Sequence, residues 1–205
     1  MARPVVTIAS IVEGDGEVKA LPKLLFRIAR QFSVDLRVPA PARVHKGRLV
    51  AAGGVERAVS AAAQRVGAAG GVLVLLDADD DCPAELGPDL LGRARAARSD
   101  VLVSVVLANH EFEAWFLAAA ESLAGSHGFP AGLSAPPDPE KIRGTKEWLT
   151  ANRTGNQSYK PTVDQAPLAS AFDIKLARSG SPSFDKFCRD VQSLLTPGIP
   201  RPGSS

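Results

Sequence analysis

Residues 72–81 read VLVLLDADDD, five consecutive aliphatic residues followed at once by acid. An aliphatic run of this length, without polar alternation, is typical of a strand that is covered on both faces. Residues 5–12 and 101–107 form further runs of this kind, and residues 34–38 alternate as a shorter strand. The sequence therefore predicts about four strands.

Helical periodicity fills the segments between and after these strands. The predicted helices cover residues 20–32, 50–69, 86–98 and 111–123. Because a parallel neighbour is reached only by crossing over the sheet, this alternation indicates a parallel sheet with right-handed crossovers. We expect an α/β fold of three layers, with helices on both sides of a parallel sheet of about four strands.

The pattern changes after residue 124. A Gly/Pro-rich link runs to residue 139, and helical stretches follow at residues 140–151, 165–177 and 184–195. Residues 1–124 are therefore predicted to form the α/β core and residues 125–196 a C-terminal helical annex. Residues 197–205 are rich in Pro, Gly and Ser, and we expect a disordered tail there.

The composition is that of an ordinary globular domain. Of 205 residues, 45% are hydrophobic and 22% are charged, and the formal net charge is +2. So small a charge gives no general attraction to nucleic acid or to an anionic membrane, and electrostatic recognition must be local. No run of roughly 18 apolar residues and no signal pattern is found, so we expect a cytoplasmic protein with no membrane partner. The spacing of Cys82 and Cys188 predicts neither a disulfide framework nor a zinc site.

Acidic residues gather behind two of the predicted strands. Seven of the 22 acidic residues lie within residues 13–17 and 77–81, directly after the first and third strands. In an open parallel sheet both loops emerge at the carboxyl edge of the strands, where ligands bind, so the two clusters are expected to face each other. Asp77, Asp79 and Asp81 alternate along the chain and should point into one site, whereas Asp80 should point away.

Carboxylates held close together raise one another's pKa and cost free energy unless a cation offsets their repulsion. A hard divalent cation fits oxygen ligands best, and Mg²⁺ needs only one or two protein carboxylates beside a substrate phosphate. The predicted ligands are Glu13, Asp77, Asp79 and Asp81, and the expected cofactor is Mg²⁺ or Mn²⁺. Structural roles stay open: Asp80 and Asp81 suit a solvated turn and helix N-cap, and Glu17 suits the start of the next helix.

Positive charge is available in two places. A basic segment after the second strand contains Lys46 and Arg48, and Lys160 lies in a polar loop of the predicted annex. Each is a candidate for neutralising a backbone phosphate, with a solvated surface cation as the alternative. Glu111 and Glu113 follow the fourth strand and are outer-shell candidates that would support the metal or hold Lys46. Their alternative is to complement the dipole at a helix N-terminus.

Several short stretches resemble a known pattern. They are IVEGDGE at residues 11–17, LPKLL at 21–25, LLDADDD at 75–81, EFEAWF at 111–116 and SYKPT at 158–162. The first three resemble the Toprim pattern, in which a Glu closes the first strand and an Asp-x-Asp closes a later one. Over about residues 4–195, the sequence is most similar to DUF4276, a Toprim-like family of domains of unknown function that looks related to the Toprim nucleases of the OLD type.

The resemblance implies a Toprim- or Rossmann-like sheet and Mg²⁺-dependent phosphodiester cleavage of nucleic acid, DNA in preference to RNA. It also implies a phage-defence or DNA-repair system with an AAA- or ABC-type ATPase as partner, and it leaves a homodimer open. By position, Glu13 matches the Toprim general acid/base or metal ligand, and Asp77 and Asp79 match the metal-binding Asp-x-Asp, so these three are the predicted catalytic residues. Glu17 matches the second acid of a Glu-Gly-x-x-Glu variant and becomes a further predicted metal ligand. No residue clearly matches the phosphate-contacting lysine of those nucleases.

Two other functions are consistent with the sequence. A Toprim-like module could bind a metal or nucleotide as a non-catalytic subunit of a larger assembly. An Asp-based phosphotransfer domain would also place an Asp at a strand end beside Mg²⁺, but the first strand here ends in Glu, and Asn109 stands where a receiver domain needs Thr or Ser. A dinucleotide-binding loop is disfavoured, because Asp15 and Glu17 put negative charge where a pyrophosphate would lie.

Overall fold

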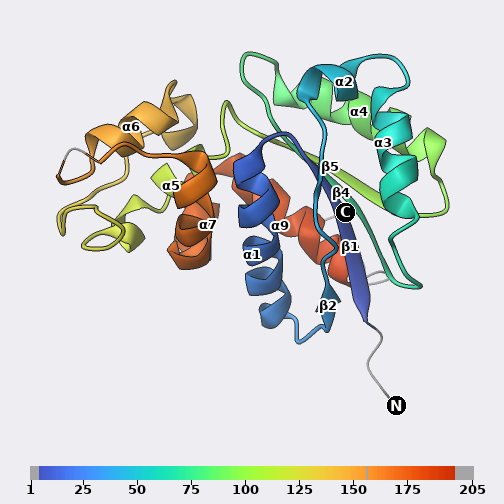
Figure 1. Ribbon diagram of the computed structural model, residues 1–205, viewed down its shortest axis with the longest axis horizontal. Coiled ribbons are helices and arrows are strands. Elements are labelled where there is room, and N and C mark those ends of the chain that lie inside the picture. Colours follow the sequence, from blue (N-terminus) through green and yellow to red (C-terminus); the bar gives the residue numbers. More distant parts are fainter. Residues whose placement is uncertain (1–4, 156, 197–205) are drawn as a thin grey trace.

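The computed structural model describes residues 5–155 and 157–196, and the expected tail at residues 197–205 lies outside these ranges. In the described part the chain forms one five-stranded sheet in which every strand pairing is parallel (Figure 1). The predicted α/β class and parallel sheet are therefore confirmed.

Three long strands form the body of this sheet. They are β1 (Val6–Val12), β4 (Gly70–Asp77) and β5 (Leu102–Ala108), and β4 lies between the other two. Two short strands, β2 (Leu36–Arg37) and β3 (Ala42–Arg43), both pair with β1. The sheet has five strands instead of about four because Ala42–Arg43, which fall in none of the predicted strands, form β3 beside the end of β1.

The strand register brings the strand ends to one edge. Val12, the last residue of β1, pairs with Leu75 of β4 and with Arg43 of β3. Asp77, the last residue of β4, pairs with Ala108 at the end of β5. The segments that follow β1, β3, β4 and β5 therefore all leave the sheet at its carboxyl edge.

Helices connect the strands, and further helices come after the last strand in the sequence. The α-helices are α1 (Asp15–Gln31), α2 (Lys46–Val50), α3 (Gly54–Ala63), α4 (Pro83–Ala97), α5 (Ala114–Leu117), α6 (Thr145–Ala151), α7 (Pro161–Ala171), α8 (Ile174–Gly180) and α9 (Pro182–Leu195). The short 3₁₀ helices are η1 (Ala120–Leu123) and η2 (Pro139–Lys141).

Several predicted helix boundaries are wrong, each for a local reason. Helix α1 begins at Asp15 instead of residue 20, because the Glu17 carboxylate accepts a hydrogen bond from the Gly14 N–H and caps the first turn. The helix predicted at residues 50–69 is interrupted by Gly53, which has a φ of +69°, and the chain ahead of the break folds as α2. A side chain on Gly54 would put its Cβ 1.8 Å from the Arg48 carbonyl oxygen, so the break depends on glycine.

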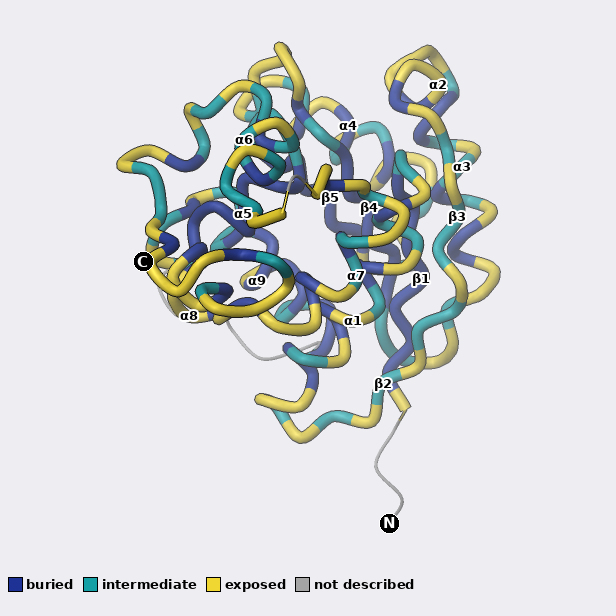
Figure 2. The backbone as a smooth tube through the Cα atoms, turned by 60° about the vertical axis from the view of Figure 1, so that its left-hand side comes forward, coloured by how far each residue is buried: buried dark blue, intermediate teal, exposed yellow. Residues whose placement is uncertain are grey.

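Helices cover both faces of the sheet, and each face has its own hydrophobic cluster. Alternate residues of β1 and β4, such as Val12 and Leu75, pack with α1, α7 and α9. The intervening residues, such as Ile11 and Val74, pack with α3 and α4 on the other face. Every residue of β1 is buried (Figure 2), which confirms that this strand is covered on both sides.

The helices of the predicted annex contribute to the first of these clusters. Phe184 and Phe187 of α9 are fully buried, and each lies with its ring centroid 5.0 Å from that of Trp115. Helix α9 also packs directly against β4 and β5, and α7 packs against α1. The sheet and the C-terminal helices therefore share one continuous hydrophobic core. No helix in the described ranges has the length and apolar character needed to cross a membrane.

This shared core predicts the cost of removing one aromatic ring from α9. Phe184→Ala leaves a cavity between α9 and Trp115, and we expect the free energy of unfolding to fall by about 3 to 5 kcal/mol. Urea denaturation measures the change. Phe26→Ala on α1 is the matched control, because the Phe26 side chain is 44% exposed, and we expect less than about 1 kcal/mol there. Equal effects of the two changes would contradict the shared core.

Candidate functional site

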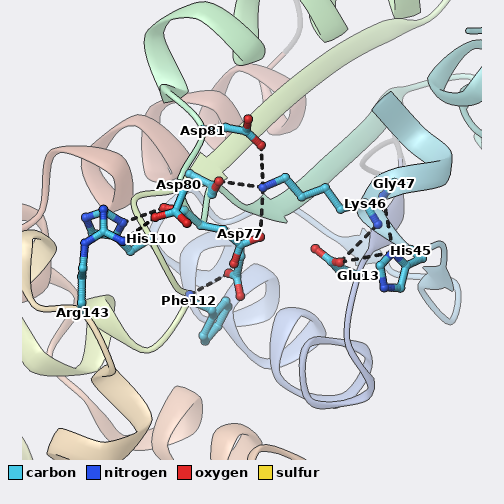
Figure 3. Close-up of polar contacts among 12 residues, drawn as sticks. Glu13, His45, Lys46, Gly47, Asp77, Asp80, Asp81, His110, Phe112 and Arg143 are labelled. Carbon is cyan, nitrogen blue, oxygen red and sulfur yellow. Dashed lines mark hydrogen bonds and ion pairs between the residues drawn. The ribbon is translucent and has the colours of Figure 1, made fainter. Parts of the chain in front are cut away.

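The carboxyl edge of the sheet carries the acidic residues that the sequence predicts. Glu13 follows β1, Asp77 ends β4 and begins the segment to Asp81, and Glu111 and Glu113 follow β5. The end of β3 and the start of α2 lie beside Glu13 and bring His45 and Lys46 to the same edge (Figure 3). The site is therefore built from segments that are far apart in the sequence and meet because the strands are parallel.

Lys46 links the first two of these acidic segments, the one at Glu13 and the one from Asp77 to Asp81. Its Nζ donates to the Ala78 carbonyl oxygen at 2.6 Å and lies 3.0 Å from an Asp79 carboxylate oxygen and 2.8 Å from one of Asp81 (Figure 3). Burial acts to lower the pKa of Lys46, but the ion pairs with Asp81 and Asp79 outweigh it, so the pKa is raised. Lys46 was a candidate for phosphate binding, but in this structure its ammonium pairs with acidic side chains and a carbonyl oxygen of the protein itself.

Glu13 contacts the backbone of Lys46, whereas Asp79 and Asp81 contact its side chain. Its Oε1 accepts a hydrogen bond from the Lys46 N–H at 3.2 Å and lies 3.8 Å from His45 Nδ1. Its backbone oxygen accepts from Arg43 Nε at 3.2 Å, and Arg43 also pairs with Asp15 at 3.4 Å. The Glu13 side chain is 25% exposed and remains accessible at the sheet edge.

Asp77 faces inward. Part of the residue is exposed, but its carboxyl group is enclosed by protein, and Oδ1 accepts a hydrogen bond from the Phe112 N–H at 2.7 Å (Figure 3). Burial raises the pKa of Asp77 well above its usual value, and the charges of Glu113 and Glu17 raise it further. Lys146 and the Phe112 hydrogen bond act in the opposite direction but do not outweigh them. Burial and the neighbouring acids Glu113 and Glu17 thus together disfavour the charged form of Asp77.

Glu113 is the most deeply buried acid of the site, with a side chain that is 1% exposed. Its Oε1 accepts a hydrogen bond from the Tyr159 hydroxyl at 2.9 Å, while its Oε2 is buried without a hydrogen-bond partner. Lys146 Nζ lies 3.5 Å from that second oxygen. Burial raises the pKa of Glu113, as it does for Tyr159, whose pKa the Glu113 charge raises further.

Glu111 and Glu113 hold Lys146, whereas the sequence suggested Lys46. Glu111 forms an ion pair with Lys146 and accepts a hydrogen bond from the Thr145 N–H at 2.9 Å. Burial acts to lower the pKa of Lys146, but Glu113 and Glu111 outweigh it and raise the pKa. Lys146 is thus a charged residue that brings α6 to the acidic edge.

Glu17 takes up the structural role that the sequence left open. Its Oε2 accepts from the Gly14 N–H at 2.6 Å, and its Oε1 accepts from Gln165 Nε2 at 2.8 Å. Gln165 belongs to α7 and is fully buried, with an Oε1 that has no hydrogen-bond partner. Glu17 therefore caps α1 and joins it to α7, while its charge still acts on Asp77.

The remaining candidates lie further out. Asp80 turns away from Lys46 and forms an ion pair with Arg143 (Figure 3). Lys160 is exposed at the start of α7, where its backbone N–H donates to Asp164. Arg48 is exposed on α2. Within the described residues, neither Arg48 nor Lys160 forms an ion pair with the acids of the site.

The acids meet at one edge without forming a complete metal cage. In residues 5–155 and 157–196, no group of three or more His, Cys, Asp or Glu side chains is arranged to hold a metal ion. Instead the two lysines divide the acids into two groups. The outer group consists of Asp79, Asp81 and Lys46, and the inner group consists of Asp77, Glu111, Glu113 and Lys146.

Sequence reasoning missed Lys146 and the burial of Tyr159. Lys146 lies in a separate helix, 33 residues beyond Glu113, and no motif joins the two. Tyr159 belongs to the SYKPT stretch that carries part of the family resemblance. That stretch was a usable signal, but the polar residues around Tyr159 gave no indication that its ring is buried against Glu113.

The raised pKa of Asp77 predicts a pH-dependent effect of Asp77→Asn. An unfolded Asp titrates at about pH 3.9, so the folded state is penalised progressively as the pH rises above that value and through the raised pKa. Asparagine keeps an oxygen for the Phe112 N–H and removes the charge. Without divalent cations, we expect Asp77→Asn to stabilise the protein at about pH 8 by on the order of 1 to 3 kcal/mol, and the gain to vanish towards about pH 4.

Urea denaturation across this pH range measures the effect. Asp100→Asn is the control of opposite sign, since the hydrogen bond from Arg98 lowers the pKa of Asp100 to about 2. That variant should show no gain at any pH. A loss of stability in Asp77→Asn that does not change with pH would contradict the assigned cause.

Comparison with known proteins places the chain in a family. No curated protein and no solved structure matches the chain at a significant level. One family model, described as a domain of unknown function (DUF4276), matches residues 12–192, a span that includes the acidic segments and all the helices from α1 to α8. The protein therefore belongs to the DUF4276 family.

Proposed function

We propose that this protein is a Toprim-type phosphodiesterase that uses Mg²⁺ or Mn²⁺ to cleave nucleic acid. The observation that carries the proposal is the meeting of acids at the carboxyl edge of β1, β4 and β5, with Asp77 enclosed near Glu113 and Glu17. Binding sites of open parallel sheets lie at this edge. The resemblance of the acidic motifs to the Toprim pattern supports the same reading.

The chemistry of the donor set fits a hard divalent cation. The acids offer carboxylate oxygens, which Mg²⁺ prefers. The Glu113 Oε2 atom is buried without a hydrogen-bond partner, and mutual repulsion contributes to the raised pKa of Asp77. The residues proposed to hold the cation are Glu13, Asp77, Asp79 and Asp81. Glu17, expected from the sequence as a further ligand, has both carboxylate oxygens engaged by Gly14 and Gln165 and is proposed to act through its charge on Asp77. A divalent cation supplies activation of a water molecule and stabilisation of the leaving oxygen when it is bound at such a site.

The surrounding residues position and balance these acids. The Phe112 N–H orients Asp77, and the Lys46 N–H orients Glu13. Lys146 places a positive charge near Asp77 and is our candidate for the phosphate-contacting lysine, which sequence comparison did not supply. Exposed Arg48 on α2 and exposed Lys160, the residue before α7, are proposed to contact the flanking backbone phosphates.

We propose DNA in preference to RNA as the substrate. We also propose a cytoplasmic phage-defence or DNA-repair system with an AAA- or ABC-type ATPase partner. These proposals rest on the likeness to OLD-type Toprim nucleases.

One observation favours the alternative of a non-catalytic metal- or nucleotide-binding subunit, since the Lys46 ammonium already contacts both Asp79 and Asp81. Measurements of cleavage and of cation binding separate the two functions.

Cleavage of supercoiled plasmid DNA tests the proposal. We expect nicking by the purified protein in Mg²⁺ or Mn²⁺ and none in a chelator. Glu13→Gln and Asp77→Asn keep the oxygens that accept from the Lys46 and Phe112 N–H groups. Because each removes one charge while keeping these hydrogen bonds, we expect the nicking rate to fall roughly 100-fold or more. Asp100→Asn, next to β5 at the opposite edge of the sheet, should nick at the wild-type rate.

Cation-dependent melting separates the possible outcomes. A cation that binds only the folded state raises the melting temperature, and about 100 times its dissociation constant stabilises by about 2.7 kcal/mol. Cation binding without cleavage would favour the non-catalytic subunit. Cleavage that survives both Glu13→Gln and Asp77→Asn would indicate a contaminating nuclease, and absence of both cleavage and binding would overturn the proposal.

A further inference from the structure

The Lys46 ammonium occupies a site of unusual composition. It has three N–H groups, and its three acceptors are the Ala78 carbonyl oxygen at 2.6 Å, Asp79 at 3.0 Å and Asp81 at 2.8 Å. The Lys46 side chain is 11% exposed, while those of Asp79 and Asp81 are 59% and 54% exposed. The cation is thus enclosed, and its two carboxylate partners are open to solvent on their other side.

These acceptors are also ligands of the kind that a hard cation uses. Two carboxylates and one backbone carbonyl provide oxygen atoms only, which suits Mg²⁺. Among the described residues, no other lysine or arginine pairs with Asp79 or Asp81. Without Lys46, the two carboxylates would repel each other across one residue of a short turn, where Asp79 already has a φ of +52°.

The backbone of Lys46 is held independently of its side chain. Its N–H donates to Glu13, the His45 side chain caps the Gly47 N–H, and the Val44 N–H donates to the end of β1 at 2.8 Å. Leu49 anchors α2 in the hydrophobic core. The contacts of the Lys46 ammonium are therefore separate from the backbone N–H contact that orients Glu13 (Figure 3).

We propose that Lys46 is a built-in counter-ion that competes with a divalent cation for Asp79 and Asp81, so that cation binding releases the Lys46 ammonium. The inference rests on the proposed function, because it concerns the same carboxylates. It adds a regulatory consequence: the metal-free site keeps its shape and resists weakly bound cations. Lys46 acts as a positioning residue when metal is absent.

Calorimetric titration with Mg²⁺ alone, in the absence of nucleic acid, tests the competition. Lys46→Met keeps the length of the aliphatic side chain and removes the charge. Because a like charge no longer opposes the cation, we expect Mg²⁺ to bind roughly tenfold more tightly. The metal-free variant should melt a few degrees below the wild type, since Asp79 and Asp81 are left unpaired, and saturating Mg²⁺ should remove that difference.

Lys186→Met is the matched control. Lys186 Nζ also donates to a strand carbonyl, that of Val105 at 2.8 Å, and pairs with a carboxylate, that of Asp190 at 2.7 Å. Val105 lies in the middle of β5, away from the carboxyl edge. Mg²⁺ affinity should be unchanged in this variant. An equal gain in both variants would show a general charge effect and overturn the inference.

The outcomes separate this inference from the proposed function. Tighter Mg²⁺ binding by Lys46→Met alone supports both. Equal or weaker binding by Lys46→Met, with normal binding by the wild type, overturns the competition and leaves the metal site standing. Absence of Mg²⁺ binding in both proteins overturns the competition and the metal-dependent function together.

Chemical labelling of the wild-type chain gives a measurement that needs no variant. An amine-reactive acylating reagent should modify Lys46 slowly without Mg²⁺, because all three N–H groups are engaged and the side chain is enclosed. We expect the labelling of Lys46, followed by peptide mass spectrometry, to accelerate several-fold with Mg²⁺ and to saturate at the same concentration as the calorimetric binding. Labelling that is unchanged or slowed by Mg²⁺ would overturn the release of the ammonium.

Discussion

Parallel pairing of β1, β4 and β5 is the constraint on which the rest of this molecule depends. Parallel strands that are buried on both faces have no room for charge along their length, so ionisable groups are confined to the strand ends. The register aligns those ends, with Val12 opposite Leu75 and Asp77 opposite Ala108. The fold thereby concentrates acids at one edge, and the cost of that concentration has to be offset by groups from elsewhere in the chain.

Two lysines from different parts of the sequence provide this offset, and they do so in different surroundings. Lys46 serves Asp79 and Asp81, both more than half exposed, where water screens much of the repulsion. Lys146 serves Glu111 and the buried Glu113, where screening is weak, and the pKa of Glu113 stays raised despite the pair. The carboxylates of the outer group therefore repel each other less than buried ones would, whereas Glu113 of the inner group still raises the pKa of Asp77.

The sequence predicts the parts of this arrangement that follow from local pattern. Aliphatic runs marked β1, β4 and β5, and the position of Glu13 and Asp77 at strand ends followed from those runs. Hydrophobic periodicity placed the start of α1 at residue 20, whereas the helix begins at Asp15, because the Glu17 hydrogen bond that caps it leaves no periodic signal; Glu17 was recognised only as suited to a helix start. Lys146 was missed because its partners lie on another element, and packing alone brings α6 to them. Lys46 was recognised as a cation near the site. Its ion pairs with Asp79 and Asp81 could not be predicted, because they depend on the placement of β3 beside β1.

The C-terminal helices belong to the site as well as to the core. Tyr159 donates to Glu113, Lys146 pairs with Glu111 and Glu113, and Gln165 donates to Glu17. The segment after residue 124 therefore supplies partners to acids that follow both β1 and β5. A buried carboxylate that loses its charged partner costs about 3 to 5 kcal/mol, a large share of the stability of a domain this size. Residues 5–124 alone would also lose α9 from one face of the sheet. The acidic edge and the C-terminal helices are therefore joined by side-chain contacts and by a shared core, and the chemistry proposed for the edge depends on both.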